Sequence, residues 1–232
     1  LFEWRGNGEL WSRLFAEFVS GLDAPSHYYR PFTFLSYGLN LTLSGTHPVP
    51  WHLINLVGHL AAGAAVYRIT SVLQVGASSR VGPAFATALF LLLGTNVEAV
   101  AWISGRYDVF ATAFSLWAAV FYLESRAGFD RRELGALLCG LLALASKESG
   151  AVLPGLIACL AWIKHGESPA AVRWQSIARD VAPWVLLIAG YFALRLAIFG
   201  SMLSVYPDAN PLLRIADGSW MTLPRTALPW LS

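Results

Sequence analysis

Three charged residues separate two apolar runs in the segment NVEAVAWISGRYDVF, residues 96–110. Glu98, Arg106 and Asp108 stand between the runs 81–93 and 109–123. An unpaired charge in hydrocarbon costs on the order of several kcal/mol, so charges in such a place are expected to have partners or a function. A second charged group, Lys147 and Glu148 in SKESG, follows a later apolar run.

The spacing of the first group predicts which of its side chains share a helix face. If one helix continues through Arg106, then Glu98, Trp102 and Arg106 lie on one face at i, i+4 and i+8. Asp108 then points elsewhere or follows a break at Gly105. Glu98 is the residue of this group expected below the lipid headgroups.

A carboxylate at that depth needs a partner, because an unpaired one would take up a proton. Lys147 and Glu148 are the candidates for Glu98. Adjacent residues project about 100° apart on a helix. Lys147 and Glu148 are therefore expected to pair with other helices rather than with each other.

The segment WHLINLVGH, residues 51–59, carries a polar stripe on an apolar helix. His52, Asn55 and His59 fall at i, i+3 and i+7, on one face. The two histidines lie about 10 Å apart along the axis, whereas ligands of one zinc ion lie within about 4 Å of each other. A shared metal is not expected. Two readings stay open: interhelical hydrogen bonds that fix packing, or the lining of a cavity.

The elements that position these residues are transmembrane helices. Of the 232 residues 56% are hydrophobic and 13% charged, against about 25% charged in soluble domains. We predict an all-α, polytopic transmembrane helix bundle with outer-face amphipathic helices. About six spans are expected, the fourth and fifth short and joined by a tight turn at 146–150. They are 51–73, 82–102, 107–123, 134–145, 151–163 and 181–200.

The basic residues predict the orientation of the bundle. Alternate linkers are rich in arginine and lysine, and by the positive-inside rule these linkers are cytoplasmic. The segments 96–108 and 146–149 then face the outer side, with the N-terminal segment and the tail. The cytoplasmic set is Arg68, Arg80, Arg126, Arg131, Arg132, Lys164, Arg173 and Arg179.

Residues 1–200 are expected to form one membrane domain, in which 1–50 is an outer loop and 51–200 the spans. Within the loop, 10–18 has the spacing of an interfacial amphipathic helix, and Pro31 and Gly45 bound a second helix at the outer surface. Residues 201–232 read as an outer loop or the start of a further element. The chain is expected to lack its natural N-terminus and part of its C-terminal side.

The two charged turns are predicted to converge on the outer side in a polar chamber with Arg30, roofed by residues 1–30 and the tail. Arginine and lysine in a partly dry site suit phosphate, and a site at bilayer level suits a lipid phosphate or diphosphate. A structural ion-pair network, as in a membrane scaffold, is the alternative. A transporter is a third reading, weakened because the charges lie at one face and not at the midplane. The net charge of +2 gives no indication of nucleic acid binding.

Four segments, YRPFTFLSYGLN, WHLINLVGH, NVEAVAWISGR with Asp108, and LLALASKESGAVLP, occur in an order that resembles the GT-C membrane glycosyltransferases. The closest likeness is to the protein O-mannosyltransferase-like group that often carries tetratricopeptide repeats. It covers about residues 28–155. The resemblance implies transfer of a sugar from a polyprenyl-phosphate donor to a hydroxyl of a protein or glycan, on the outer or lumenal side, with inversion and without a metal or other cofactor.

The resemblance also implies roles for particular residues. An acidic residue in the first outer loop takes the proton of the acceptor, and positive groups stabilise the departing lipid phosphate. Arg106 and Lys147 match family positions for that task, with Glu98 orienting them. The catalytic candidate is Asp23, although it does not match the place of the family's acidic pair. The expected substrate-binding residues are Arg30, His59, Glu98, Arg106, Asp108, Lys147 and Glu148.

Two features bear on this comparison and on the location of the protein. Gly94 and Thr95 stand where the family has His-Pro, and the family's acidic pair follows a first span that would precede Leu1. The alanine- and leucine-rich spans suggest a bacterial inner membrane with the site facing the periplasm. The endoplasmic reticulum membrane is the alternative.

Overall fold

The computed structural model describes residues 30–74, 79–125 and 130–199, all of them in helices or short connections. The order is α2 (Pro31–Ser44), α3 (Pro48–Leu73), α4 (Val81–Leu92), η2 (Gly94–Asn96), α5 (Val97–Ala101), η3 (Ile103–Gly105), α6 (Arg106–Glu124), α7 (Arg131–Ser146), η4 (Glu148–Val152), α8 (Leu153–Lys164) and α9 (Ala170–Phe199). The predicted all-α architecture is confirmed. The expected helix at 10–18, the tail 201–232 and Asp23 lie outside the described residues.

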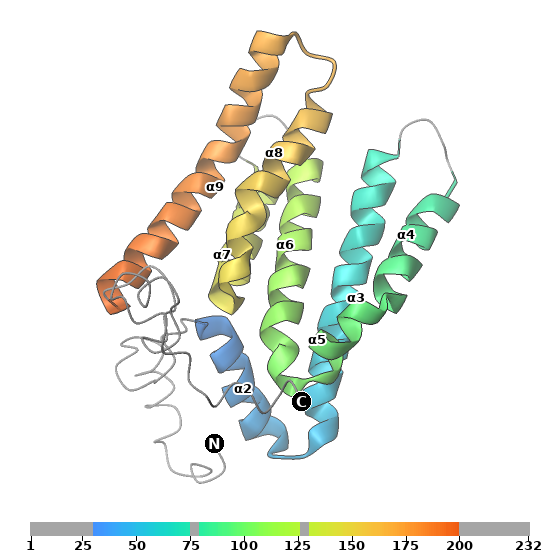
Figure 1. The fold of residues 1–232 in the computed structure, drawn as a ribbon, viewed down its shortest axis with the longest axis vertical. Helices are drawn as coiled ribbons and strands as arrows, with labels where there is room; N and C mark the ends of the chain where they lie inside the picture. Colours follow the sequence, from blue (N-terminus) through green and yellow to red (C-terminus); the bar gives the residue numbers. More distant parts are fainter. Residues whose placement is uncertain (1–29, 75–78, 126–129, 200–232) are drawn as a thin grey trace, which may run out of the picture.

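The helices form a row in which α6 is central (Figure 1). α6 packs on α3 at one side and on α7 at the other, α4 packs on α3, and α9 packs on α8 and α7. The apolar core lies between α6, α7, α8 and α9 and contains Ala119, Ala143, Ile157 and Trp184. Small residues let these helices approach closely; a Cβ on Gly140 would meet the Trp184 ring at 2.7 Å.

Local signals explain several helix ends. Proline begins α2 and α3 at their first turns, where its missing N–H costs nothing. The Asp130 carboxylate caps α7 by accepting from the backbone N–H groups of Arg132 and Glu133 at 2.9 and 2.8 Å. The expected helix between Pro31 and Gly45 is confirmed.

Two described helices, α3 and α9, are long and apolar enough to cross a membrane, and a third span is possible if α4 and the segment Gly94–Ala101 count as one bent element. The protein is thus an integral membrane protein, while the number of six spans stays a prediction. α7 and α8 have 16 and 12 residues, which agrees with the expectation that the fourth and fifth spans are short.

The predicted span over 82–102 is not one continuous helix. The helix ends at Leu92, Leu93 is extended, and the axis bends by 48° before α5. A second break at Trp102 separates α5 from α6. Glu98, Trp102 and Arg106 therefore do not share one helix face.

The two ends of the bundle differ in character. The last residues of α3, α6 and α8 lie toward one end, and α2, α5 and the start of α6 toward the other (Figure 1). The described basic linkers lie at the first end. The segments 96–108 and 146–149 lie at the second, which we call the outer end. The predicted grouping of these segments on one side is confirmed.

Candidate functional site

At the outer end, Glu148 is held between two arginines from distant parts of the chain. The Arg30 Nε and Nη2 atoms donate to Glu148 Oε2 at 3.3 and 3.1 Å. Arg195 Nη1 of α9 donates to the other oxygen, Oε1, at 2.9 Å. Burial alone would raise the pKa of the Glu148 carboxyl, but a backbone hydrogen bond and the two arginines hold it below the ordinary value.

Lys147 forms a second ion pair beside the first. Its Nζ donates to Asp108 Oδ1 of α6. The ammonium also lies 4.9 Å from the centre of the Tyr107 ring, and the Arg30 guanidinium lies 4.4 Å from the same ring. Tyr107 thus holds two cations near one aromatic ring. Lys147 and Glu148 pair with other elements and not with each other, as predicted.

These contacts bring together α2, α6, η4 and α9. The side chains of Lys147 and Asp108 are 28% and 40% exposed, so an anion in solvent can reach the ammonium. A lysine in such a place can exchange a carboxylate for a phosphate oxygen, since both are acceptors of charge-assisted hydrogen bonds. Of the residues expected in a polar chamber, Arg30, Asp108, Lys147 and Glu148 are indeed neighbours.

The sequence reasoning overlooked Arg195. It stands in the apolar run 181–200 and is fully buried. A lone arginine within an apolar span is itself a signal, because such a charge is costly unless it has a partner. Such an arginine indicates a carboxylate partner on another element, and in the structure that partner is Glu148.

Arg106 lies in the interior of the bundle. Its exposed fraction is 0%. It donates to Asn55 Oδ1 at 3.2 Å and to Asn40 Oδ1 at 2.8 Å. Two backbone oxygens also accept from it, those of Trp51 at 3.0 Å and Ser36 at 3.4 Å. Neutral oxygens thus satisfy the guanidinium, and its role at a phosphate stays a prediction.

Glu98 also departs from expectation. It is exposed on α5, and within the described residues it has no ion pair with Lys147 or any other group. The break at Trp102 turns α5 away from the helix that carries Arg106. Glu98 therefore does not orient Arg106 or Lys147 in this structure.

The polar stripe on α3 supplies donors to the broken span. His59 Nε2 lies 3.2 Å from the Leu91 oxygen, and Asn55 Nδ2 donates to the oxygens of Val100 and Trp102 at 3.4 and 2.7 Å. Carbonyls freed at a break need such donors, because lipid offers none. The packing interpretation of the stripe is confirmed for Asn55 and His59, whereas His52 is exposed.

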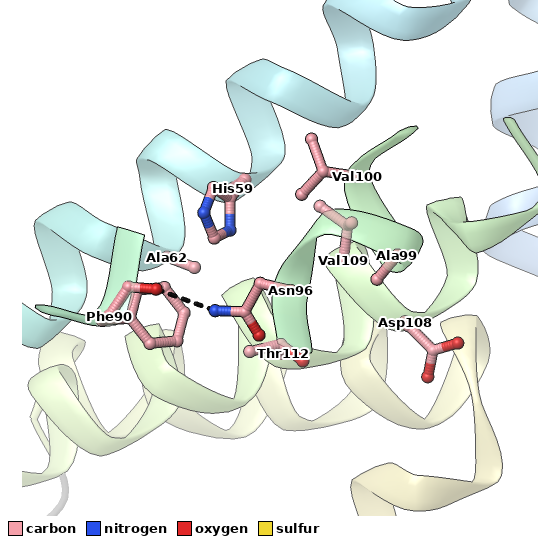
Figure 2. Close-up of a pocket in the computed structure, with 9 residues that line it drawn as sticks. All are labelled: His59, Ala62, Phe90, Asn96, Ala99, Val100, Asp108, Val109 and Thr112. Carbon is pink, nitrogen blue, oxygen red and sulfur yellow. Dashed lines mark hydrogen bonds between the residues drawn. The ribbon is translucent and has the colours of Figure 1, made fainter. Parts of the chain in front are cut away.

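His59 also lines a small pocket between α3, α6 and the broken span (Figure 2). Asn96, which donates to the Phe90 oxygen at 2.8 Å, and Thr112 line it as well. The Asp108 carboxylate lies at its edge and points away from His59 (Figure 2). The volume is about 40 Å³, enough for a few water molecules. Both interpretations of His59, packing and cavity lining, therefore hold.

Metal binding finds no support in the described part of the chain, where no three His, Cys, Asp or Glu residues are close enough to share an ion.

The fold and the charged outer end define an all-α integral membrane protein with side-chain ion pairs at one end of its helices. Comparison with known proteins shows similarity to protein O-mannosyl-transferases, which confirms the predicted resemblance. Tmtc1 of Drosophila melanogaster is 34% identical over 143 residues, 60% of this chain and 16% of that protein. TMTC4 of Mus musculus is 29% identical over 169 residues, 64% of this chain and 23% of that protein. F38B6.6 of Caenorhabditis elegans is 29% identical over 140 residues, 59% of this chain and 19% of that protein.

The matched part of this chain thus spans less than a quarter of the length of these relatives. No family model matches the sequence, and no solved structure matches the fold. The relatives are animal proteins, so the expected bacterial inner membrane finds no support in them.

Proposed function

We propose that the chain is part of an inverting, GT-C-type membrane glycosyltransferase that transfers mannose from a polyprenyl-phosphate donor to a hydroxyl of a protein acceptor. Its outer end faces the lumen of the endoplasmic reticulum. The observation that carries the proposal is the partly exposed side chain of Lys147, which shares the Tyr107 ring with Arg30 at the end of membrane helices. The names of the similar proteins supply the reaction.

The geometry fits the leaving group of that reaction. When a hydroxyl attacks the anomeric carbon, negative charge develops on the departing lipid phosphate, and fixed cations stabilise it. Lys147 would exchange Asp108 for a phosphate oxygen, while Arg30 remains over Tyr107. A carboxylate must take the hydroxyl proton. Asp23 keeps its place as the candidate, in a part of the chain that the structure does not describe.

A second function is favoured by the ion pairs themselves. Glu148 and Asp108 each have a cationic partner, as in a purely structural network that closes the end of a bundle. In that case the chain would be a non-catalytic scaffold, or a module that binds a lipid phosphate without turnover. The two functions differ in whether mannose is transferred.

The test compares two lysines in similar settings at opposite ends. Lys147 lies 4.9 Å from the Tyr107 ring at the outer end, and Lys164 lies 4.7 Å from the Tyr122 ring at the other. Microsomes from cells that express the protein would receive polyprenyl-phosphate [³H]mannose, and labelled acceptor protein would be counted. Lys147→Ala should lower transfer at least about tenfold, which corresponds to about 1.4 kcal/mol of transition-state stabilisation.

Lys164→Ala should transfer mannose as the unchanged protein does. Equal transfer by both variants at equal expression would remove Lys147 from the site. If the unchanged protein transfers nothing above microsomes that lack it, yet binds the donor, the non-catalytic function is the correct one.

A further inference from the structure

The pocket beside the broken span presents polar groups that the proposed phosphate site does not use. Thr112 of α6 lines the pocket and is exposed, so its hydroxyl can donate to a ligand and accept from one. Asn96 of η2 also lines it (Figure 2). The Asn96 Nδ2 atom donates to the Phe90 oxygen, so Oδ1 is the atom that can accept from a ligand. The pocket therefore offers a donor and two acceptors to a molecule that carries hydroxyl groups.

The other walls of the pocket are mostly apolar. The rings of His59 and Phe90 stack with their centres 5.3 Å apart, and Ala62 and Val109 also line the space. An apolar pocket with a few convergent polar groups is typical of a site for a small organic ligand. The volume of about 40 Å³ suits a few heavy atoms. It therefore suits a hydroxyl-bearing substituent of a sugar better than a whole sugar ring.

Asp108 connects this pocket to the proposed phosphate site. Its carboxylate lies at the edge of the pocket (Figure 2) and pairs with the Lys147 ammonium. Asp108 and Thr112 stand one turn apart on α6, at i and i+4, which places them on one face. When Lys147 binds the phosphate of the donor, the sugar joined to that phosphate lies next to the pocket. The released Asp108 carboxylate can then accept a hydrogen bond from a sugar hydroxyl.

The same position argues against the acceptor as the occupant of the pocket. In an inverting transfer, the attacking hydroxyl approaches the sugar from the face opposite the leaving group. The pocket shares Asp108 with the lysine that would hold the leaving phosphate, so it lies on the side of the leaving group. A substituent of the donor sugar therefore fits this place better than the hydroxyl of the acceptor.

We propose that the pocket lined by Asn96, Thr112 and Asp108 is the sugar subsite of the donor, and that one hydroxyl-bearing substituent of the sugar enters it. This inference rests on the proposed function, because Lys147 must hold the phosphate. It also gives the break after Leu92 a role, since η2, which follows the break, carries Asn96 to the pocket.

Native mass spectrometry of the full chain tests the subsite with two probes, polyprenyl-phosphate mannose and polyprenyl phosphate without a sugar. The unchanged protein should retain the mannosylated probe at least about threefold better, the effect of one or two hydrogen bonds. Thr112→Val removes the hydroxyl and should lower this ratio toward one. Thr112→Phe fills the pocket from an exposed position and should abolish the preference. Both variants should retain polyprenyl phosphate as the unchanged protein does.

Thr70→Val makes the same change near the other end of α3, and it should keep the ratio of the unchanged protein. Lys147→Ala should lower retention of both probes, which separates the phosphate site from the sugar subsite. Equal retention of the two probes by the unchanged protein would overturn the subsite and leave the phosphate site standing. A ratio that neither Thr112 variant changes would do the same. Retention of neither probe by the unchanged protein would overturn both.

Discussion

At the scale of single residues, the polar groups of the outer end divide into those that hold the fold and those that an anion can reach. Asn55 belongs to the first kind. It is fully buried, donates to Trp102 and Val100, and accepts from Arg106. Sequence spacing placed Asn55 on an inward face, but its partners come from a break that the spacing did not show.

Asn55→Leu should lower the free energy of unfolding by about 2–4 kcal/mol, because it leaves two backbone oxygens and a buried guanidinium short of partners. His52→Leu, one turn earlier on the same helix but exposed, is the control and should change it by less than about 0.5 kcal/mol. Thermal unfolding in detergent measures both. A similar loss in the two variants would show that Asn55 has no special role.

Glu148→Gln should destabilise the protein at neutral pH by about 1.5–3 kcal/mol, the contribution of hydrogen bonds to charged groups. The pKa of Glu148 is lowered by folding from its ordinary value of 4.5. Its contribution is therefore present above pH 4.5 and is lost as the pH falls through the folded-state pKa. The difference in unfolding free energy from the unchanged protein should shrink as the pH falls below 4.5. Glu167→Gln replaces an exposed, remote carboxylate and should leave the free energy of unfolding unchanged at pH 7. A loss of unfolding free energy in Glu148→Gln that does not vary with pH would contradict this prediction.

At the scale of elements, the break at Leu93 is the feature that the sequence did not predict. The length of the apolar run indicated a span over 82–102, and no proline marks the break. The break is compatible with a membrane because side chains satisfy its free carbonyls, namely His59 from α3 at Leu91 and Asn96 at Phe90. Contacts with a distant helix leave no trace in a local pattern. The helix whose ends were predicted from local signals, Pro31 and Gly45, agrees with the structure.

Two glycines beside the breaks allow a matched test. A Cβ on Gly105 would lie 2.2 Å from the Ala99 oxygen, an overlap with backbone that a rotamer change cannot relieve, whereas a Cβ on Gly94 meets nothing within 4 Å. Gly105→Ala should therefore lower stability by about 1–3 kcal/mol or more. Gly94→Ala should leave it within about 1 kcal/mol of the original, since no neighbour is disturbed. Melting temperatures in detergent would show the contrast; its absence would mean that α5 and α6 do not approach each other at Gly105.

At the scale of the whole molecule, charge distribution predicted which connections share an end. The basic linkers lie at one end because successive long helices run in opposite directions, which places alternate linkers at the same end. The positive-inside rule then assigns that end to the cytoplasm. The partners within the outer cluster were less predictable. Arg30 lies 118 residues from Glu148 along the chain, and Arg195 lies 47 residues from it. Only the packing of distant elements brings these two arginines to Glu148.

This orientation predicts opposite labelling of two exposed positions. In a Cys139→Ala/Cys159→Ala background, a single cysteine is introduced at each position. Glu98→Cys at the outer end should react with a membrane-impermeant maleimide only from the lumenal side of sealed microsomes. Glu167→Cys should react from the cytoplasmic side, because it lies between the basic residues of α8 and α9. Labelling of both from one side would contradict the arrangement.

The most direct measurement of the central claim, that the outer end binds a lipid-linked phosphate, is native mass spectrometry of the purified protein with polyprenyl-phosphate mannose. The unchanged protein and Lys164→Ala should retain one donor molecule, and Lys147→Ala should retain much less under the same collision energy. Equal retention by Lys147→Ala and Lys164→Ala, or no retention by the unchanged protein, would contradict the claim that this end of the bundle is the donor site.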